Sequence, residues 1–424
     1  MKNLWTVLPP LLADNFGFVE AVNASDGCGV IDDSGEFRLG GGHDGHGGQE
    51  GHGGRGGRDR ADREGIPPWG REKRNGRVHE GDRRSHERDG RGHGGKRGGS
   101  SRVTVSGASS EDVITGTRSR ILDAFEEVSS RFDPKFVLFS AGPCGAMIGT
   151  DLEEIAETVT RERGLPAAAV NLTGQKPYDI GLSKTLEAMA KLLAKPMARE
   201  AGTVNLLGGS ALDWAPGDVE QGKAWLEGQG LRVLAQPGGK VTAAQLETMA
   251  KAQINLVTTV SGLAAARYLQ TQFGTPYIAM TPFGSANCAR ILEALDTGLQ
   301  PQVGIPEAPA EALIIGEQLT ANAIRLELEA SGVVKAADVA TFYSLDKAFA
   351  RPNDRRIRGE DGARELLQSG GYRLVLADPL LRCFAPAGSK WVDLRHRAFN
   401  TYGEENDAPV LTAGNLNTWL NRNL

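Results

Sequence analysis

The sequence has no long uncharged apolar run and no secretory signal pattern. A membrane-spanning helix needs roughly 20 consecutive apolar residues, so we expect no membrane association. The segment 1–12 contains Pro9-Pro10 and lacks an A-x-A cleavage site, which argues against a signal peptide. A formal charge of −5 gives no general case for a nucleic-acid partner. These absences favour a cytoplasmic protein.

Cysteine is also scarce, and no two cysteines form a C-x-x-C pair, which excludes a zinc ribbon or a ferredoxin-type motif. The four cysteines are Cys28, Cys144, Cys288 and Cys383. A disulfide framework is unusual in a cytosolic chain of this length. The thiols are therefore isolated, or they are single ligands that the fold or a partner subunit brings together.

Common catalytic motifs are missing as well. The sequence has no G-x-S-x-G elbow, which argues against a serine hydrolase, and the segment 207–210 lacks the third glycine of a dinucleotide fingerprint. Outside one unusual segment, His396 is the only histidine, and it follows a predicted strand. It is either a surface loop residue, or a metal or cofactor ligand or proton donor.

The unusual segment is residues 37–100, which contains six of the seven histidines and almost no apolar residue. From residue 40 to residue 100 we count 21 Gly, 12 Arg and 2 Lys against 10 acidic residues. Such a segment buries too little surface to offset chain entropy, so we predict disorder. It could bind metal loosely, or contact nucleic acid or an acidic partner. An inert linker or a stretch translated out of frame explains the composition better than metal binding.

Elsewhere, short apolar strands alternate with helices of roughly 10 to 15 residues, which predicts parallel sheets built from right-handed βαβ crossovers. The predicted fold class is α/β, with three doubly wound, Rossmann-like parallel-sheet domains. We place the first domain at 1–36 plus 101–198, the second at 199–305 and the third at 306–424. The disordered Gly/Arg/His-rich insertion interrupts the first domain.

The stretch 136–156 is the centre of the first domain. Residues 136–140 form a predicted buried strand, which glycine and proline interrupt. Thr150 and Glu153 are spaced as the capping box of the helix that follows.

Cys144 lies in the connection between this strand and this helix. Ligands in open α/β sheets collect at such connections, near backbone N–H groups. The connection that comprises Cys144, Gly142 and Gly149 is therefore a candidate cofactor-binding loop. The alternative is a structural thiol in an ordinary loop.

Several segments, taken in order, resemble one known family, the subunits of nitrogenase component 1. Residues 143–155 are similar to its C-x-x-x-x-I-G-D-D-[IL] segment, and residues 204–214 to its "vNilG…pLD" segment. Residues 255–277 resemble its "lNlv…kfGiPyi" stretch. Residues 313–317, Asp378-Pro379 and His396 are similar to its third-domain pattern. The resemblance covers residues 1–36 and 101–424.

This resemblance implies an oxidoreductase subunit. It implies pairing with a related component 1-like subunit, in a homo- or hetero-oligomer, and an ATP-dependent iron protein as the electron donor. The chain would use low-potential electrons to reduce an unknown small molecule or cofactor, with an iron–sulfur cluster or tetrapyrrole-type chemistry between subunits. His396 falls close to the cofactor histidine of the family, which implies a catalytic role.

The departures from the family pattern concern the cluster ligands. The family's cluster cysteine lies where this chain has Pro143, one residue before Cys144. A second family motif, Gly-Cys, would fall near Ser34-Gly35. Cys144 and Cys28 are thus at most two metal ligands, whereas one cluster usually needs four. An iron–sulfur cluster would have to be shared with a partner subunit. The alternative is a non-catalytic partner or assembly subunit that keeps the fold but lacks a complete cluster site.

Overall fold

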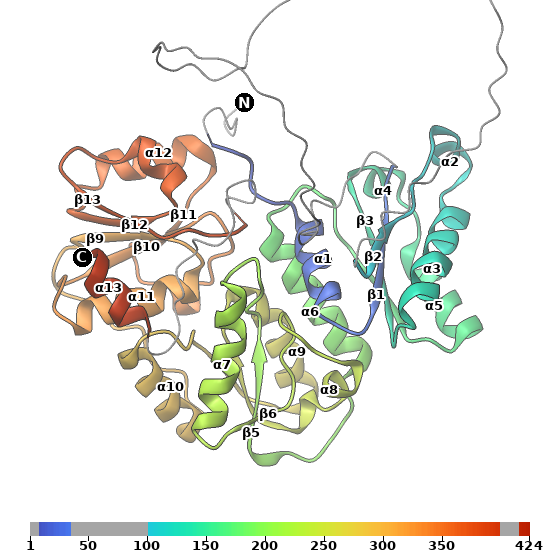
Figure 1. Ribbon diagram of the computed structural model, residues 1–424, viewed down its shortest axis with the longest axis horizontal. Coiled ribbons are helices and arrows are strands. Elements are labelled where there is room, and N and C mark those ends of the chain that lie inside the picture. The colour runs from blue at the N-terminus through green and yellow to red at the C-terminus, as the bar shows by residue number, and fades with distance from the viewer. Residues whose placement is uncertain (1–7, 35–100, 399–414) are drawn as a thin grey trace, which may run out of the picture. The chain divides into compact units, whose positions relative to one another are not determined.

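The computed structural model describes residues 8–34, 101–398 and 415–424. These residues contain three parallel β-sheets with helices against their faces (Figure 1), which confirms the predicted α/β class with three parallel-sheet domains. The Gly/Arg/His-rich segment 37–100 lies outside the described residues, so its predicted disorder stays a prediction. No helix in the described part of the chain is long and apolar enough to cross a membrane.

The first sheet has the strand order β2-β1-β3-β4, and its helices pack on both faces. Phe125 and Ile155 cover one face from α3 and α5, whereas Phe18 and Leu182 cover the other from α1 and α6. The strands are β1 (Cys28–Asp32), β2 (Val103–Val105), β3 (Val137–Ala141) and β4 (Ala167–Val170). The helices are α1 (Asp14–Asn23), α2 (Ser110–Thr115), α3 (Arg118–Phe132), α4 (Pro143–Ile148), α5 (Leu152–Arg163) and α6 (Tyr178–Leu193).

The second sheet has the order β6-β5-β7-β8. Leu226 of α7 and Ile291 of α10 pack on one face, and Leu269 of α9 packs on the other. The strands are β5 (Glu200–Leu207), β6 (Arg232–Val233), β7 (Ala252–Val257) and β8 (Tyr277–Ala279). The helices are α7 (Pro216–Gly228), α8 (Ala243–Glu247), α9 (Leu263–Phe273) and α10 (Ser285–Thr297).

The third sheet has the order β11-β10-β9-β12-β13. Ile324 of α11 and Leu416 of α13 pack on one face, and Leu367 of α12 packs on the other. The strands are β9 (Ala312–Ile315), β10 (Ala337–Thr341), β11 (Arg355–Arg356), β12 (Leu374–Ala377) and β13 (Lys390–Asp393). The helices are α11 (Gln318–Ala330), α12 (Gly359–Ser369) and α13 (Asn415–Asn423).

Two details of the central stretch differ from the sequence-based expectation. The predicted capping box at Thr150 is wrong: Asp151 caps α5, and its carboxylate accepts a hydrogen bond from the Glu154 N–H at 2.9 Å. The Thr150 hydroxyl instead lies 2.8 Å from that of Thr117. In addition, Cys144 lies in the first turn of the short helix α4 rather than in an open loop.

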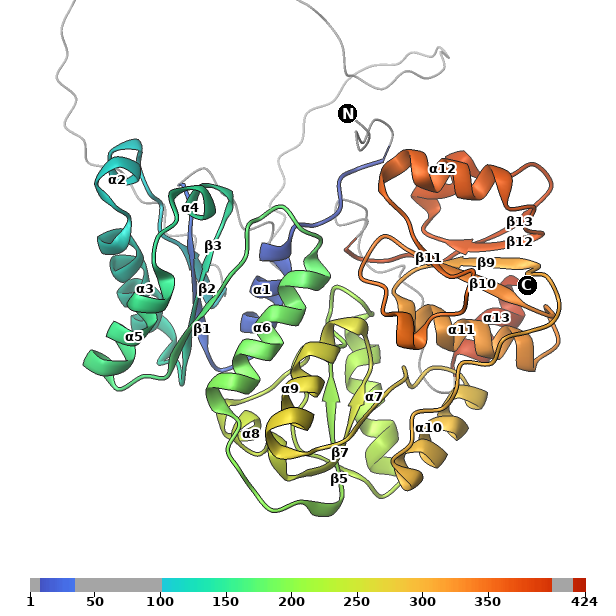
Figure 2. The ribbon, with the colours of Figure 1, turned by 180° about the vertical axis from the view of Figure 1, so that it is seen from behind.

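Helices α1 and α6 pack unusually closely and lie side by side when the structure is viewed from the front (Figure 1) and from behind (Figure 2). A Cβ atom on Gly17 would lie 2.1 Å from the Tyr178 carbonyl oxygen, and one on Gly181 would lie 1.8 Å from the Asp14 carbonyl oxygen. Glycine is therefore required at both positions. This contact fixes the start of α6, and with it the backbone of Tyr178.

Candidate functional site

A buried polar cluster lies where strands of the second and third sheets end. Within each sheet all strands are parallel, so their carboxyl ends meet at one edge, where ligands bind in open α/β folds. Asp213 follows β5, Tyr343 follows β10 and His396 follows β13. Tyr178 is the first residue of α6 and reaches the same cluster.

The four side chains form one continuous chain of hydrogen bonds. The Tyr343 hydroxyl lies 3.2 Å from His396 Nδ1, and the Tyr178 hydroxyl lies 3.3 Å from His396 Nε2. The Tyr178 hydroxyl donates its proton to Asp213 Oδ1. It must therefore accept from the imidazole, which assigns the His396 proton to Nε2. In agreement, Nδ1 also accepts the Ala398 N–H at 3.3 Å.

The imidazole of His396 is neutral because burial lowers its pKa to about 3. Asp378, directly after β12, holds the backbone of this residue: its Oδ2 accepts the His396 N–H at 3.1 Å. The rings of Tyr343 and Tyr178 lie with their centroids 4.7 and 5.8 Å from that of His396. The ring is thus held by its backbone and by both ring nitrogens.

Asp213 ends the hydrogen-bonded chain. Burial, reinforced by the nearby carboxylate of Glu317, raises the pKa of Asp213 to about 7. Its Oδ2 accepts hydrogen bonds from the Ser210 hydroxyl at 2.6 Å and from the Ser210 N–H at 3.1 Å. A carboxyl with this pKa can both take up and release a proton near neutral pH.

A second carboxyl lies beside the cluster with unused hydrogen-bonding capacity. Asp179 Oδ2 accepts the Ser344 N–H at 2.9 Å, whereas its Oδ1 is buried and has no hydrogen-bond partner among the described residues. Burial raises the pKa of Asp179. Buried polar atoms are nearly always hydrogen-bonded, so this oxygen marks a place where a polar group could be held.

The predicted loop around Cys144 lies at the corresponding edge of the first sheet. Gly142 caps α4 and donates its N–H to the Asp32 carbonyl at 3.0 Å, and a Cβ on Gly142 would lie 1.7 Å from Asp33 Oδ2. Gly149 ends α4 with a φ of +74° and donates to the Gly145 carbonyl at 3.0 Å. Both predicted glycines thus shape the connection, but their N–H groups already have partners.

Cys28 and Cys144 are not brought together. Cys28 begins β1 and pairs with Val137, whereas Cys144 follows the opposite end of β3. Four residues separate the two ends, which corresponds to about 13 Å at the rise of a β-strand. Cys28 is fully buried in the core, and burial raises the pKa of its thiol to about 12. Cys144 is half-buried at the edge.

Comparison with known proteins identifies the family and the fold of this chain. The family described as nitrogenase component 1 type oxidoreductase matches residues 83–344, more than half of the chain. The chain belongs to this family. A solved nitrogenase structure, "Nitrogenase Cp1 at pH 6.5", superimposes with a TM-score of 0.62 at 11% identity and covers 100% of this chain and 94% of that one. That likeness shows the fold.

Among the relatives of this nitrogenase component 1 family member is the nitrogenase molybdenum-iron protein alpha chain of Methanothermobacter thermautotrophicus. It is 26% identical over 50% of this chain and 45% of its own length. A subunit of the light-independent protochlorophyllide reductase of Roseobacter denitrificans is 25% identical over 43% and 36%. The cofactor biosynthesis protein NifE of Methanosarcina barkeri is 23% identical over 41% and 40%. Each match spans less than half of the relative.

The thiols of this component 1 family member do not form a complete iron–sulfur site. All four cysteines lie in the described part of the chain, and no group of three or more His, Cys, Asp or Glu side chains there could hold a metal ion. Cys288 is buried on α10, and Cys383 is exposed beside the Leu380 carbonyl. Cys144 and Cys383 are thus the thiols that an outside cluster could reach, and of these Cys144 lies in the segment that resembles the family's cluster motif.

Sequence reasoning found His396 but missed the residues that it contacts. Tyr178, Tyr343 and Asp213 come from three separate segments of the sequence, and their convergence depends on how the second and third sheets pack. The available signal was position in the sequence: Asp213 belongs to the segment 204–214 that resembles the family.

Proposed function

We propose that this chain is a cytoplasmic subunit of a nitrogenase-like oxidoreductase that accepts low-potential electrons from an ATP-dependent iron–sulfur protein and reduces a small molecule or cofactor. The hydrogen-bonded chain Tyr343–His396–Tyr178–Asp213 at the strand ends carries this proposal. Reduction of a bound molecule usually consumes protons as well as electrons, and these four hydrogen-bonded side chains can transfer protons. The three predicted domains provide the framework, with the boundaries given above.

His396 is the proposed catalytic residue. Its neutral imidazole can pass a proton from Nε2 while it accepts another at Nδ1, because both ring nitrogens are already aligned with hydroxyl groups. Asp213, with its pKa raised to about 7, can store a proton at the end of the relay. The unsatisfied Oδ1 of Asp179 is the nearby candidate for orienting a polar substrate group.

Cys144 is the proposed single thiolate that this chain offers to a shared iron–sulfur cluster, which when bound would supply electrons. The neighbouring Met147 is 85% exposed on the same short helix. An exposed methionine of this kind is suited to an adaptable protein contact. A related component 1-like subunit would dock here and provide the remaining ligands. Cys28 is not a ligand in this proposal, because it lies in the core at the start of β1, at the opposite edge of the sheet from Cys144.

The alternative function is a non-catalytic partner or assembly subunit. Two observations favour it: the described residues contain no complete metal-ligand set, and one relative is named as a cofactor biosynthesis protein. In that case the chain would keep the fold and the subunit interface without taking part in reduction.

Electron transfer to the purified complex separates the two functions. The chain is co-purified anaerobically with its partner subunit and mixed with the reduced iron–sulfur protein and ATP. The reductase proposal predicts ATP-dependent oxidation of that protein, which Cys144→Ala abolishes and Cys383→Ala leaves unchanged. A complex that contains iron but accepts electrons equally well with Cys144→Ala would overturn the assigned role of this thiol. A complex that accepts no electrons would favour the assembly function.

A further inference from the structure

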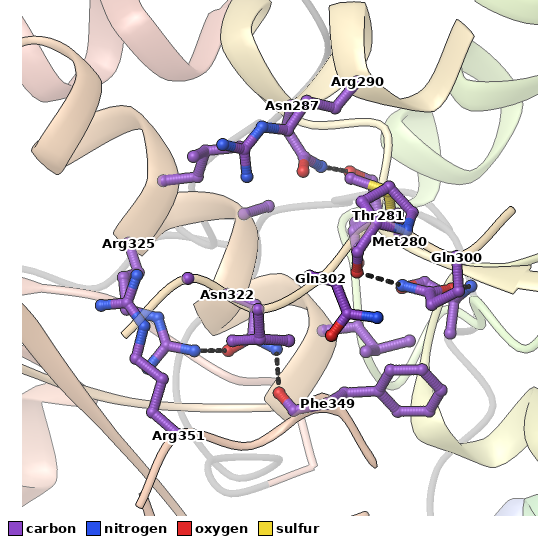
Figure 3. Close-up of a pocket in the computed structure, with 17 residues that line it drawn as sticks. Met280, Thr281, Asn287, Arg290, Gln300, Gln302, Asn322, Arg325, Phe349 and Arg351 are labelled. Atoms are coloured by element: carbon purple, nitrogen blue, oxygen red, sulfur yellow. Dashed lines mark hydrogen bonds between the residues drawn. The ribbon is translucent and has the colours of Figure 1, made fainter. Parts of the chain in front are cut away.

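A cavity lies between helices of the second and third sheets, and none of the residues of the hydrogen-bonded chain around His396 lines it. Its walls come from α10, α11, the segment 300–304 and the residues around Phe349 (Figure 3). Its volume is about 70 Å³. One water molecule needs about 10 to 15 Å³ on this measure, so the cavity suits a molecule of roughly five water-sized groups.

The lining of this cavity is strongly biased in charge. The 17 lining residues include three arginines and four side-chain amides but neither aspartate nor glutamate. The arginines are Arg290, Arg325 and Arg351. Guanidinium groups match the geometry of carboxylates and phosphates, to which they donate two parallel hydrogen bonds.

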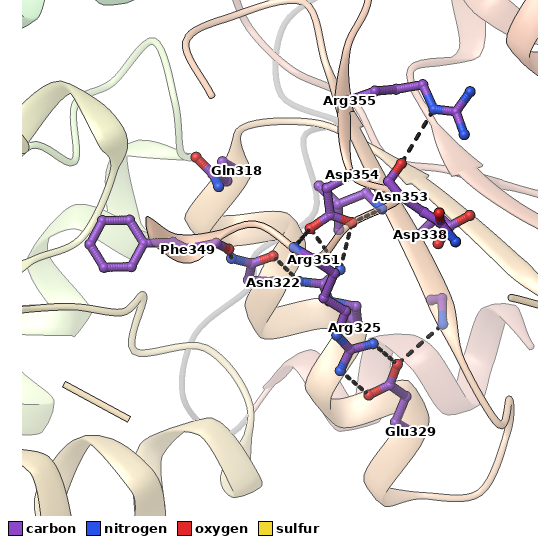
Figure 4. A network of polar contacts seen from close by, with 12 residues as sticks. Gln318, Asn322, Arg325, Glu329, Asp338, Phe349, Arg351, Asn353, Asp354 and Arg355 are labelled. Carbon is purple, nitrogen blue, oxygen red and sulfur yellow. Dashed lines mark hydrogen bonds and ion pairs between the residues drawn. The ribbon is translucent and has the colours of Figure 1, made fainter. Parts of the chain in front are cut away.

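Two of these arginines are fixed in place by carboxylates outside the lining (Figure 4). Arg325 Nη1 lies 2.7 and 3.0 Å from the two carboxylate oxygens of Asp354, and the Arg325 residue is only 2% exposed. Arg351 makes a bidentate pair with Glu329 at 2.5 and 2.8 Å. These ion pairs neutralise most of the positive charge of Arg325 and Arg351 and hold both arginine side chains rigidly. The Nε–H of Arg351 is nevertheless buried without an acceptor among the described residues.

The third arginine is different, because Arg290 is exposed and its side chain has no hydrogen-bond or ion-pair partner among the described residues. The same holds for the amide of Gln302 on the opposite segment. The cavity therefore combines one uncompensated positive charge and a free amide with a lining that contains no carboxylate. A ligand with negatively charged oxygens would satisfy both groups.

We propose that this cavity, the Arg290 cavity, binds a small oxyanion, either a carboxylate or a phosphate. Arg290 supplies the charge, and the Arg290 guanidinium and the Gln302 amide donate hydrogen bonds. This site is independent of the proposed reductase function, and its ligand is distinct from the molecule that is reduced.

Calorimetric titration of the full chain tests this proposal, with inorganic phosphate and malonate as separate probes at constant pH and ionic strength. We expect saturable binding of at least one probe, weakened about tenfold or more by Arg290→Gln. Arg382→Gln is the matched control, since it removes an equally exposed arginine whose side chain has no partner in the described chain. Gln302→Ala provides a second, independent weakening variant.

Each outcome has a defined meaning. Binding of phosphate alone identifies a phosphate site, binding of malonate alone a carboxylate site, and binding of both a general oxyanion site. No heat of binding for either probe up to about 10 mM overturns the proposal. Equal affinities of Arg290→Gln and Arg382→Gln do so too.

Discussion

At the scale of single residues, the direction of the hydrogen bonds around His396 sets what the site can do. Tyr178 donates to Asp213 and therefore accepts from the imidazole, and Tyr343 donates to the other ring nitrogen. In each of these hydrogen bonds the donor lies on the Tyr343 side and the acceptor on the Asp213 side. One proton transfer across each hydrogen bond can therefore carry a proton from the Tyr343 hydroxyl to Asp213. The Asp213 carboxyl, with a pKa of about 7, is suited to receive this proton.

Asp213 makes stability depend on pH in a direction that can be tested. Its pKa is raised from 3.8 to about 7 on folding, so the folded chain holds a proton that the unfolded chain releases between about pH 4 and pH 7. The free energy of unfolding therefore falls as the pH rises through this window. Asp213→Asn cannot titrate, and we expect it to remove up to about 3 kcal/mol of the decline between about pH 5 and pH 8. Urea unfolding at about pH 5 and about pH 8 measures it.

His396 contributes a slope of the opposite sign. Its pKa is lowered from 6.5 to about 3 in the folded chain, so stability is lost as the pH falls below about 6.5. This contribution is present in both proteins and cancels when Asp213→Asn is compared with the unmodified chain. The same loss of stability in both proteins between pH 5 and pH 8 would contradict the proton assigned to Asp213.

The four thiols should differ sharply in reactivity. Burial raises the pKa values of Cys28 and Cys288 to about 12, whereas Cys144 is half-buried and Cys383 is exposed. Since the thiolate is the reactive form, we expect iodoacetamide to label Cys383 and Cys144 in the folded chain. Cys28 and Cys288 should react only after unfolding. Mass spectrometry of peptides reports each site, and rapid labelling of native Cys28 would show that β1 is not as buried as described.

The sequence predicted individual residues better than their contacts. His396 was identifiable because it is the only histidine outside the Gly/Arg/His-rich segment and because it follows a strand. Its partners Tyr178 and Tyr343 are separated from it by 218 and 53 positions. No local pattern encodes such a pairing. Cys28 and Cys144 were predicted as at most two metal ligands, and only the register of β1 and β3 shows that they lie at opposite ends of these strands.

At the scale of elements, the contact between α1 and α6 depends on glycine. We expect Gly181→Ala to destabilise the chain by about 2 kcal/mol or more, because the new Cβ would lie 1.8 Å from the Asp14 carbonyl oxygen. Gly222→Ala, in α7, is the matched control: its Cβ meets Pro282 only at 3.5 Å. Removing a helical glycine there should stabilise by about 0.5 to 1 kcal/mol. Thermal unfolding of both variants checks this, and equal effects would refute the close packing.

Removing the N-cap of α5 should have a smaller effect on the free energy of unfolding. Asp151→Ala should cost about 1 kcal/mol, because the Glu154 N–H loses its acceptor. Asp151→Asn keeps a side-chain oxygen and should change the free energy of unfolding by only a few tenths of a kcal/mol. Denaturant unfolding compares the two. A large loss with Thr150→Ala and none with Asp151→Ala would restore the cap expected from the sequence.

Most elements were predictable because their apolar periodicity is strong. The strand expected at 136–140 is found at Val137–Ala141, shifted by one residue. The Thr150 prediction was wrong because Thr150 and Asp151 are adjacent and either could cap the helix. The Thr150 hydroxyl is instead hydrogen-bonded to that of Thr117.

At the scale of the whole molecule, the fold is established, whereas a bound iron–sulfur cluster is a proposal. Three parallel sheets follow from the order of strands and helices, and the family match agrees with them. A shared cluster requires ligands that this chain does not have, because its accessible thiols, Cys144 and Cys383, follow strands of different sheets. Its remaining ligands would belong to another polypeptide, which no property of this sequence can specify.

Iron and acid-labile sulfide content of the anaerobically purified complex tests the central claim most directly. The unmodified chain is compared with Cys144→Ala and with Cys383→Ala, each in complex with the same partner subunit. The reductase account predicts iron and sulfide in nearly equal amounts in the unmodified and Cys383→Ala complexes, and a loss of most of both in the Cys144→Ala complex. A stable complex without iron, or one that keeps its full iron content with Cys144→Ala, would contradict it.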